Sequence, residues 1–188
     1  MAVQIGAQGQ AGFDRPFALM SDCHRRIEHF LTIFQRVVDR YARVPLDQEA
    51  RTALTVSARY FRESAPNHTA DEEESLFPRL RSLDRRDLDA LLTEAERLER
   101  EHDRAKLLHD SVDARIGRWL DAGELGEGEI GELQDELDTL SALYAGHIEF
   151  EDRTLFPRAQ CVLTTEAIRE IGSEMAARRG KSYPSGPA

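Results

Sequence analysis

The sequence predicts an all-α protein, an antiparallel up-down-up-down four-helix bundle with a short fifth helix at the C-terminal end. Apolar residues recur at steps of three and four residues along four long segments, which is the period of a helix, and the alternation typical of strands is almost absent. One sequence pattern also occurs twice, at residues 68–79 and again at residues 147–158. Two copies at so long a period favour a closed bundle over a stacked array of repeats.

Caps and breakers set the expected limits of the helices. Pro16 fits the first turn of a helix, and Asp47 follows a proline-containing loop as the cap of the second helix. Pro66 lacks a backbone donor and clashes with the preceding turn, so we expect a break or kink between Ser64 and Asn67. The predicted helices span about residues 16–42, 47–80, 86–120, 129–161 and 165–179.

The length of the chain suits one domain. A chain of 188 residues buries roughly 70% of the surface that its unfolded form exposes, which is adequate for one core. We predict a flexible N-terminal segment at residues 1–13, the bundle at 14–161, the C-terminal helix at 162–180 and a disordered tail at 181–188.

Charge and composition argue against several functions. The net charge of -10 and the pI near 5.1 disfavour binding to nucleic acid or to an anionic membrane surface, because both need clustered Lys and Arg. No run of about 18 apolar residues occurs, and the segment from Met1 to Asp14 lacks an apolar core, so neither membrane insertion nor secretion is expected. Cys23 and Cys161 form no spaced set, which fits a reducing, cytoplasmic location.

The repeated pattern reads His-x-x-x-Glu-x-x-x-Leu-Phe-Pro-Arg in both copies. It places His68 four residues before Glu72, and His147 four residues before Glu151. In a helix this spacing puts the imidazole and the carboxylate on one face, about one turn apart. Such a pair is typical of metal ligands.

A further histidine precedes each copy. His24 and His102 stand at matching places in the two halves, so two helical hairpins related by a pseudo-twofold axis would bring four histidines and two glutamates to one point. A metal-free bundle with buried histidines is the alternative, but six residues in matched order are difficult to ascribe to packing. The candidate metal ligands are His24, His68, Glu72, His102, His147 and Glu151.

The donor atoms favour a dinuclear centre. Imidazole nitrogens and carboxylate oxygens suit Fe, with Mn or Zn as alternatives, better than a metal that prefers thiolates. Two six-coordinate irons need about twelve ligand positions. If both glutamates bridge and an oxo or hydroxo group is shared, about two positions stay open for an external ligand.

These residues resemble the hemerythrin-like, or HHE cation-binding, domain family. The resemblance rests on Asp22-x-His24, on Glu101-His102 and on both His-x-x-x-Glu motifs with their Leu-Phe-Pro, and it covers about residues 14–160. It implies an up-down four-helix bundle with a non-heme di-iron centre of two Fe ions. The ligands that it implies are His24, His68, Glu72, His102, His147 and Glu151.

One departure from the family affects the expected function. Oxygen-carrying hemerythrins have a second histidine on the third helix, whereas Lys106 and Leu98 occupy the positions one turn either side of His102. This disfavours reversible oxygen carriage. We expect a di-iron protein that reacts with a small diatomic or peroxide ligand, namely oxygen, nitric oxide or peroxide, in redox or stress defence. The alternative is an oxygen or iron sensor, or an iron store, without turnover. Whether it is an enzyme stays open, as does its oligomeric state.

Several neighbouring residues have two interpretations each. Glu28 and Glu101 could orient imidazoles, or form surface salt bridges. His109 and Tyr144 could line a channel for the ligand, or pack in the core. The other acidic residues around Glu72 are expected to be solvated or to support a ligand from outside: Asp71, Glu73 and Glu74.

Overall fold

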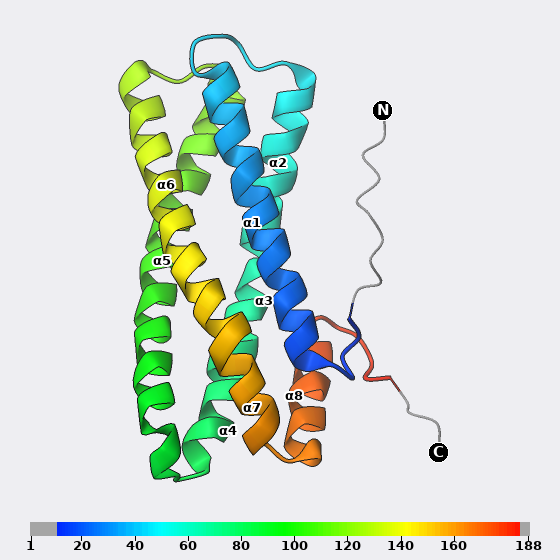
Figure 1. The fold of residues 1–188 in the computed structure, drawn as a ribbon. Coiled ribbons are helices and arrows are strands. Elements are labelled where there is room, and N and C mark those ends of the chain that lie inside the picture. The colour runs from blue at the N-terminus through cyan, green and yellow to red at the C-terminus, as the bar shows by residue number, and fades with distance from the viewer. Residues whose placement is uncertain (1–10, 185–188) are drawn as a thin grey trace.

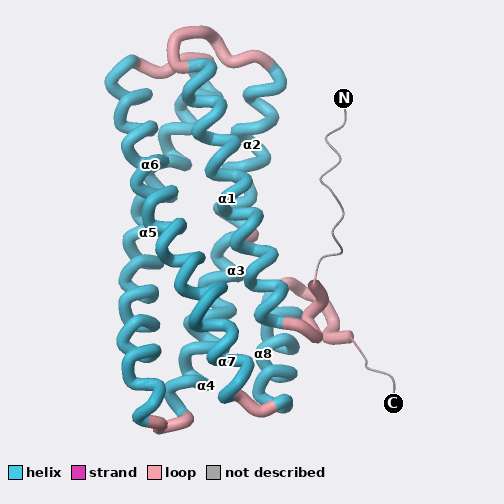
Figure 2. The backbone as a smooth tube through the Cα atoms, in the orientation of Figure 1, coloured by secondary structure: helices cyan, strands magenta, loops and turns pink. Residues whose placement is uncertain are grey.

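The computed structural model of the protein describes residues 11–184. All regular structure in this range is helical, and Figure 2 shows helices joined by loops, with no strand among the described residues. The predicted all-α class is therefore confirmed. The expectations of a flexible N-terminal segment and of a disordered tail fall largely on residues 1–10 and 185–188, which lie outside the described range.

The long helices lie side by side along one common direction (Figure 1). In chain order the helical elements are α1 (Pro16–Tyr41), α2 (Gln48–Glu63), α3 (Ala65–Ala70), η1 (Asp71–Leu76), α4 (Phe77–Ser82), η2 (Arg86–Leu88), α5 (Asp89–Ala122), α6 (Glu127–Phe150), η3 (Glu151–Leu155), α7 (Phe156–Val162) and α8 (Thr165–Arg178). Helix α1 packs against α2 and α6, and α5 packs against the same two helices. In Figure 1 the loops after α1 and α5 lie at one end of the molecule, and those after α4 and α7 lie at the other.

Local sequence explains most of the helix ends. Pro16 stands in the first turn of α1, and the side chain of Asp47 accepts a hydrogen bond from the backbone N–H of Ala50, as a cap of α2 should. Gly123 ends α5 with a φ of 84°, a left-handed conformation that glycine adopts without strain. The break expected before Pro66 is confirmed, because α2 ends at Glu63 and α3 begins at Ala65.

Two wide helical turns replace the continuous helices predicted through residues 80 and 161. In η1 and η3 the backbone bonds with a π-helical step, so the N–H of Phe77 donates to the carbonyl of Glu72, and that of Phe156 donates to Glu151. The physical reason lies in Pro78 and Pro157, which lack an N–H and would clash with a carbonyl of the preceding α-helical turn. The widened turn accommodates each proline and carries one of the two glutamates.

Buried apolar side chains form two clusters, one toward each end of the bundle. The first contains Phe34, Leu54 and Trp119. The second contains Leu76, Phe77, Leu155 and Phe156 of the two Leu-Phe-Pro motifs, together with Met175 of α8. The candidate ligands occupy the turns between these clusters.

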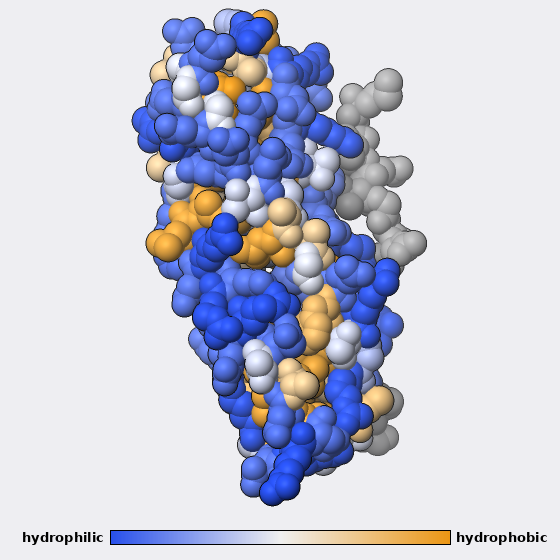
Figure 3. Space-filling view, turned by 60° about the vertical axis from the view of Figure 1, so that its left-hand side comes forward, coloured by the Kyte–Doolittle hydropathy of each residue, from blue (hydrophilic) through white to orange (hydrophobic). Residues whose placement is uncertain are grey.

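The outer surface is polar. On the side where α5 and α6 come forward, Figure 3 shows mostly hydrophilic residues, with hydrophobic ones gathered in places around the middle. This division is what an amphipathic helix produces when its apolar face is turned inward. None of the described helices is long and apolar enough to cross a membrane.

Candidate metal centre

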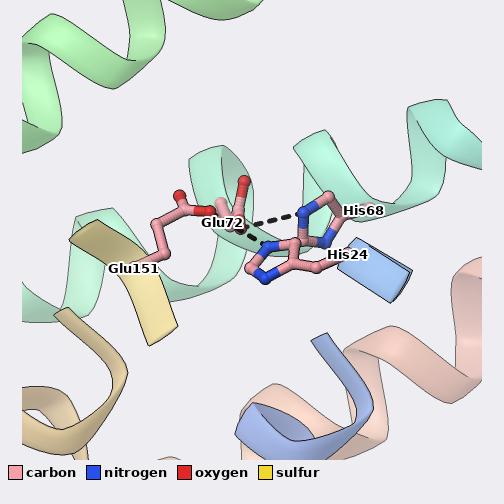
Figure 4. A group of neighbouring side chains, drawn as sticks. All are labelled: His24, His68, Glu72 and Glu151. Atoms are coloured by element: carbon pink, nitrogen blue, oxygen red, sulfur yellow. Dashed lines mark ion pairs between the residues drawn. The ribbon is translucent and has the colours of Figure 1, made fainter. Parts of the chain in front are cut away.

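All six predicted ligand side chains meet in the interior of the bundle. His24 lies on α1, His102 on α5, and the other four belong to the two His-x-x-x-Glu motifs, at α3–η1 and α6–η3. None of the six is more than 9% exposed. In Figure 4, His24, His68, Glu72 and Glu151 point toward one another from different segments.

Each glutamate reaches a histidine from both halves of the chain. The carboxylate of Glu151 lies 3.0 Å from Nε2 of His24 and 3.1 Å from Nε2 of His147. The carboxylate of Glu72 lies 3.3 Å from Nε2 of His68 and also 3.3 Å from Nε2 of His102. This is the arrangement that two bridging carboxylates would have.

The side chains form two groups that share both glutamates. His24 and His68 complete the first group, and His102 and His147 complete the second. Within each group the four donor atoms lie within 4.8 Å of one another, close enough to hold one metal ion. Two adjoining metal positions therefore fit the site.

The chemistry of the donors also fits a cation. The four carboxylate oxygens of Glu72 and Glu151 are buried, and within residues 11–184 none of them receives a hydrogen bond. Two buried carboxylates that lack donors and face each other are costly, unless a positive charge compensates them. A pair of divalent cations would supply that charge, and the nitrogen and oxygen donors suit Fe, Mn or Zn.

Outer carboxylates hold three of the four imidazoles from behind. Each accepts a hydrogen bond from Nδ1–H, which leaves the lone pair of Nε2 directed at the centre. The pairs are His24 with Asp152 at 3.0 Å, His102 with Glu73 at 2.7 Å and His147 with Glu101 at 3.1 Å.

These outer contacts decide some of the alternatives left by the sequence. Glu101 fits both interpretations, because it orients the imidazole of His147 and also pairs with Arg97, whereas Glu28 is exposed on α1 and contacts no candidate ligand. Asp152 was not singled out from the sequence. Its position directly after Glu151, which matches Glu73 directly after Glu72, was the available signal.

Asp71 is neither solvated nor directed at an imidazole, so the expectation for it was wrong. Its carboxylate is fully buried and pairs with Arg178 at 2.9 Å and with Arg179 at 2.6 Å. The reason is that α8 packs across η1 and brings both guanidinium groups to this carboxylate. The C-terminal helix is thus attached one residue away from Glu72.

The pKa values of the candidate ligands shift in both directions: burial lowers that of His68, whereas those of the other three histidines and of Glu72 are raised. Burial lowers the pKa of His24, but the hydrogen bond to Asp152 and the nearby carboxylates of Glu151 and Glu72 outweigh it and raise that pKa to about 10. The same balance, with Glu72 as the leading partner, raises the pKa of His102 to about 10. Burial and the charge of Glu151 raise the pKa of Glu72 to about 7. Because a cation must displace these protons, metal binding is expected to weaken as the pH falls.

A cavity of about 530 Å³ adjoins the centre. All four candidate histidines reach its wall, together with Phe61, His109 and Tyr144. Nε2 of His109 lies 3.1 Å from the hydroxyl of Tyr144, and burial lowers the pKa of His109 to about 4. A neutral imidazole with its proton on Nδ1 accepts the hydroxyl proton of Tyr144 at Nε2, and one with its proton on Nε2 donates to the hydroxyl oxygen, so the tautomer of His109 sets the direction of this hydrogen bond. Both residues line the cavity and also pack on the first apolar cluster, where His109 stacks on Phe61, so the structure supports both interpretations given above.

Comparison with known proteins gives two matches. The model of the family described as "Hemerythrin HHE cation binding domain" matches residues 15–159, which include all six candidate ligands. A protein of Haemophilus influenzae, described only as an uncharacterized protein, is 24% identical over 174 residues, which make up 90% of this chain and 92% of that relative.

Proposed function

This chain belongs to the hemerythrin HHE cation-binding domain family, and from that premise we propose that it is a non-heme di-iron protein that reacts with oxygen, peroxide or nitric oxide. The proposed ligands of the two iron ions are His24, His68, Glu72, His102, His147 and Glu151. The same premise favours an up-down-up-down antiparallel order for the four long helical segments.

One observation carries the proposal. Each of the two buried glutamates contacts one histidine from either half of the chain, and its oxygens have no hydrogen-bond donor in the described part of the chain. A metal-free bundle would leave both carboxylates uncompensated at the centre of its core. Two cations held by Glu72 and Glu151 would account for this arrangement.

A di-iron pair supplies electrons to small oxidising ligands when it is bound. The protein contributes the surroundings. If both glutamates bridge and an oxo or hydroxo group is shared, the four imidazoles and two carboxylates leave about two positions open. The adjoining cavity offers room for a diatomic molecule or a peroxide. On its wall lie two polar groups beside such a ligand, the hydroxyl of Tyr144 and Nε2 of His109, which are 3.1 Å apart.

Metal analysis and rapid kinetics test this function. Protein purified without a chelating tag should contain two irons per chain and show charge-transfer bands in the visible range. After anaerobic reduction it should be oxidised by air without a long-lived oxygenated form, and it should consume peroxide while a reductant is present. Stopped-flow spectroscopy measures both reactions. An adduct that releases oxygen under vacuum would favour carriage, and no reaction at all would favour storage or a redox-inert metal.

A sensor is the second candidate, and one observation favours it. The pairing of Asp71 with Arg178 and Arg179 links α8 to the residue beside Glu72. A change at the centre could alter how α8 docks, which is the kind of bistable element that a sensor needs. If α8 exchanges its amide hydrogens at the same rate with and without metal, this candidate is excluded.

A further inference from the structure

The two halves of the centre are related position by position, and one position breaks the relation. His24 corresponds to His102, and His68 corresponds to His147. The residue directly before His102 is Glu101, whereas the residue directly before His24 is Cys23. The pseudo-twofold axis thus relates the carboxylate of Glu101 to the thiol of Cys23.

This difference changes the support of one ligand. Glu101 accepts a hydrogen bond from Nδ1 of His147, at 3.1 Å. Cys23 cannot play the same part for His68, because a thiol is a weak acceptor and Arg26 already approaches its sulfur at 3.1 Å. Nδ1 of His68 is accordingly buried with no hydrogen-bond partner among the residues that the structure describes.

The other pair of outer carboxylates is preserved. Asp152 holds His24 and Glu73 holds His102, each from the position that follows a bridging glutamate. One metal position therefore has carboxylate support behind both of its imidazoles, and the other has it behind only one. Such support fixes the ring orientation and raises the basicity of the nitrogen that binds the metal.

We propose that the two metal positions are unequal: the one at His102 and His147 fills first, and the one at His24 and His68 binds its ion more weakly. This inference rests on the proposed function, since it assumes a metal pair. Loss of an outer carboxylate typically lowers metal affinity about 10- to 100-fold, so a separation of that size is expected. The weaker ion is the exchangeable one, and at limiting metal the chain holds a single ion.

Titration of the metal-free protein with Co²⁺ tests the inequality. Calorimetry and the visible bands of Co²⁺ should give two dissociation constants about 10- to 100-fold apart. Anomalous diffraction from crystals grown with one equivalent of Co²⁺ should place the ion beside His102 and His147. Two equal constants, or a first ion beside His24 and His68, would overturn the inference.

A pair of matched variants isolates the cause. Glu101→Ala removes the support of His147, so the tighter constant should weaken and the separation between the two constants should collapse. Glu94→Ala is the control, because Arg97 contacts both Glu94 and Glu101 but only Glu101 reaches a histidine. It should leave both constants unchanged. An unchanged separation in Glu101→Ala refutes the inference.

The converse variant should strengthen the weaker position. Cys23→Glu places a carboxylate where the pseudo-twofold expects one, and it should raise the affinity at His68 toward that at His147. The Glu101→Ala result stands by itself if Cys23→Glu does not fold. Failure of the unaltered protein to bind Co²⁺ would count against the proposed metal site itself, whereas two ions of equal affinity in that protein would count against the inequality alone.

Discussion

Asp71, Glu72 and Glu73 are consecutive residues that face three different partners. Asp71 pairs with the arginines at the end of α8, Glu72 faces the centre, and Glu73 holds His102. Successive residues of a helix point about 100° apart, so neighbouring carboxylates reach different surroundings. All three residues carry a carboxylate, so the role of each depends on the direction in which its side chain points.

Glu72 and Glu151 should be equivalent in metal binding. Glu72→Gln and Glu151→Gln each replace a carboxylate oxygen with an amide group that donates hydrogen bonds and bridges poorly. Both variants should therefore lose metal to a similar extent, to one ion per chain or fewer, as measured by elemental analysis. Glu149→Gln, on the exposed side of α6, is the control and should bind metal normally. If one bridging variant lost both ions and the other lost none, the two carboxylates could not share a role.

His109 should make stability depend on pH. Its pKa of about 4 in the folded protein lies below its ordinary value of 6.5, so between these limits the unfolded chain binds more protons. Above pH 6.5 the burial of His109 costs no unfolding free energy through its proton. Between pH 6.5 and about 4 the unfolding free energy falls by about 1.4 kcal/mol for each pH unit. His109→Gln keeps an acceptor for Tyr144 and lacks this dependence. Its unfolding free energy should therefore decline less than that of the wild type between pH 7 and pH 5, whereas parallel curves would show that His109 is not the cause.

The common face of each His-x-x-x-Glu pair could be predicted at the residue scale because its spacing is local. A step of four residues from His68 to Glu72 fixes a common helix face whatever the rest of the chain does. The contact of Asp71 with α8 could not be predicted in that way. Arg178 lies 107 positions from Asp71, and no periodic pattern in the sequence joins them.

At the scale of the element, the wide turns η1 and η3 have the same place in both halves. Each begins at or beside a bridging glutamate and ends before a Phe-Pro pair. Apolar residues keep their helical spacing through both segments, so the sequence predicts an uninterrupted helix there. Pro78 and Pro157 were the signal of irregular backbone, but a proline near the end of a predicted helix is also compatible with a simple kink.

The attachment of α8 gives a prediction at this scale. Asp71 is fully buried, whereas the side chains of Arg178 and Arg179 are 18% and 19% exposed. Replacing both arginines with Met should cost about 3 kcal/mol of unfolding free energy, because it leaves a buried charge uncompensated. Adding Asp71→Asn to that variant should recover part of the loss, as denaturant titration would measure.

The control is Glu170→Gln, which is also on α8 and weakens an exposed contact with Arg79 of α4. It should change the unfolding free energy by less than about 1 kcal/mol. If Asp71→Asn gave no recovery in the arginine variant, the burial of Asp71 would not be the source of the cost.

On the scale of the whole molecule, the candidate centre separates two apolar clusters and joins the helices between them. Metal removal should therefore lower the stability of the entire bundle. At a free metal concentration 100 times the dissociation constant, bound metal adds about 2.7 kcal/mol. The melting temperature should fall on treatment with a chelator and recover on reloading. The double variant of both bridging glutamates to Gln should show no such response.

The all-helical class could be predicted from periodicity, since the apolar stripes fix which faces turn inward. The attachment of the fifth helix to the outside of the bundle could not be predicted, because the sequence of α8 contains little that indicates which distant residues it contacts. Its place depends on the packing of Met175 in the second cluster and on the buried charge of Asp71.

The adjacency of Asp71 and Glu72 makes the docking of α8 and the occupancy of the centre reciprocal. If docking of α8 increases metal affinity by some free energy, thermodynamic linkage requires that bound metal stabilise the docked α8 by the same amount. The peptide bonds after Arg178 and Arg179 are trypsin sites, and a protease cleaves them from the opened form, at a rate that follows its population. Slow cleavage of the loaded protein and fast cleavage of the metal-free protein would thus report the state of a buried centre from the end of the chain.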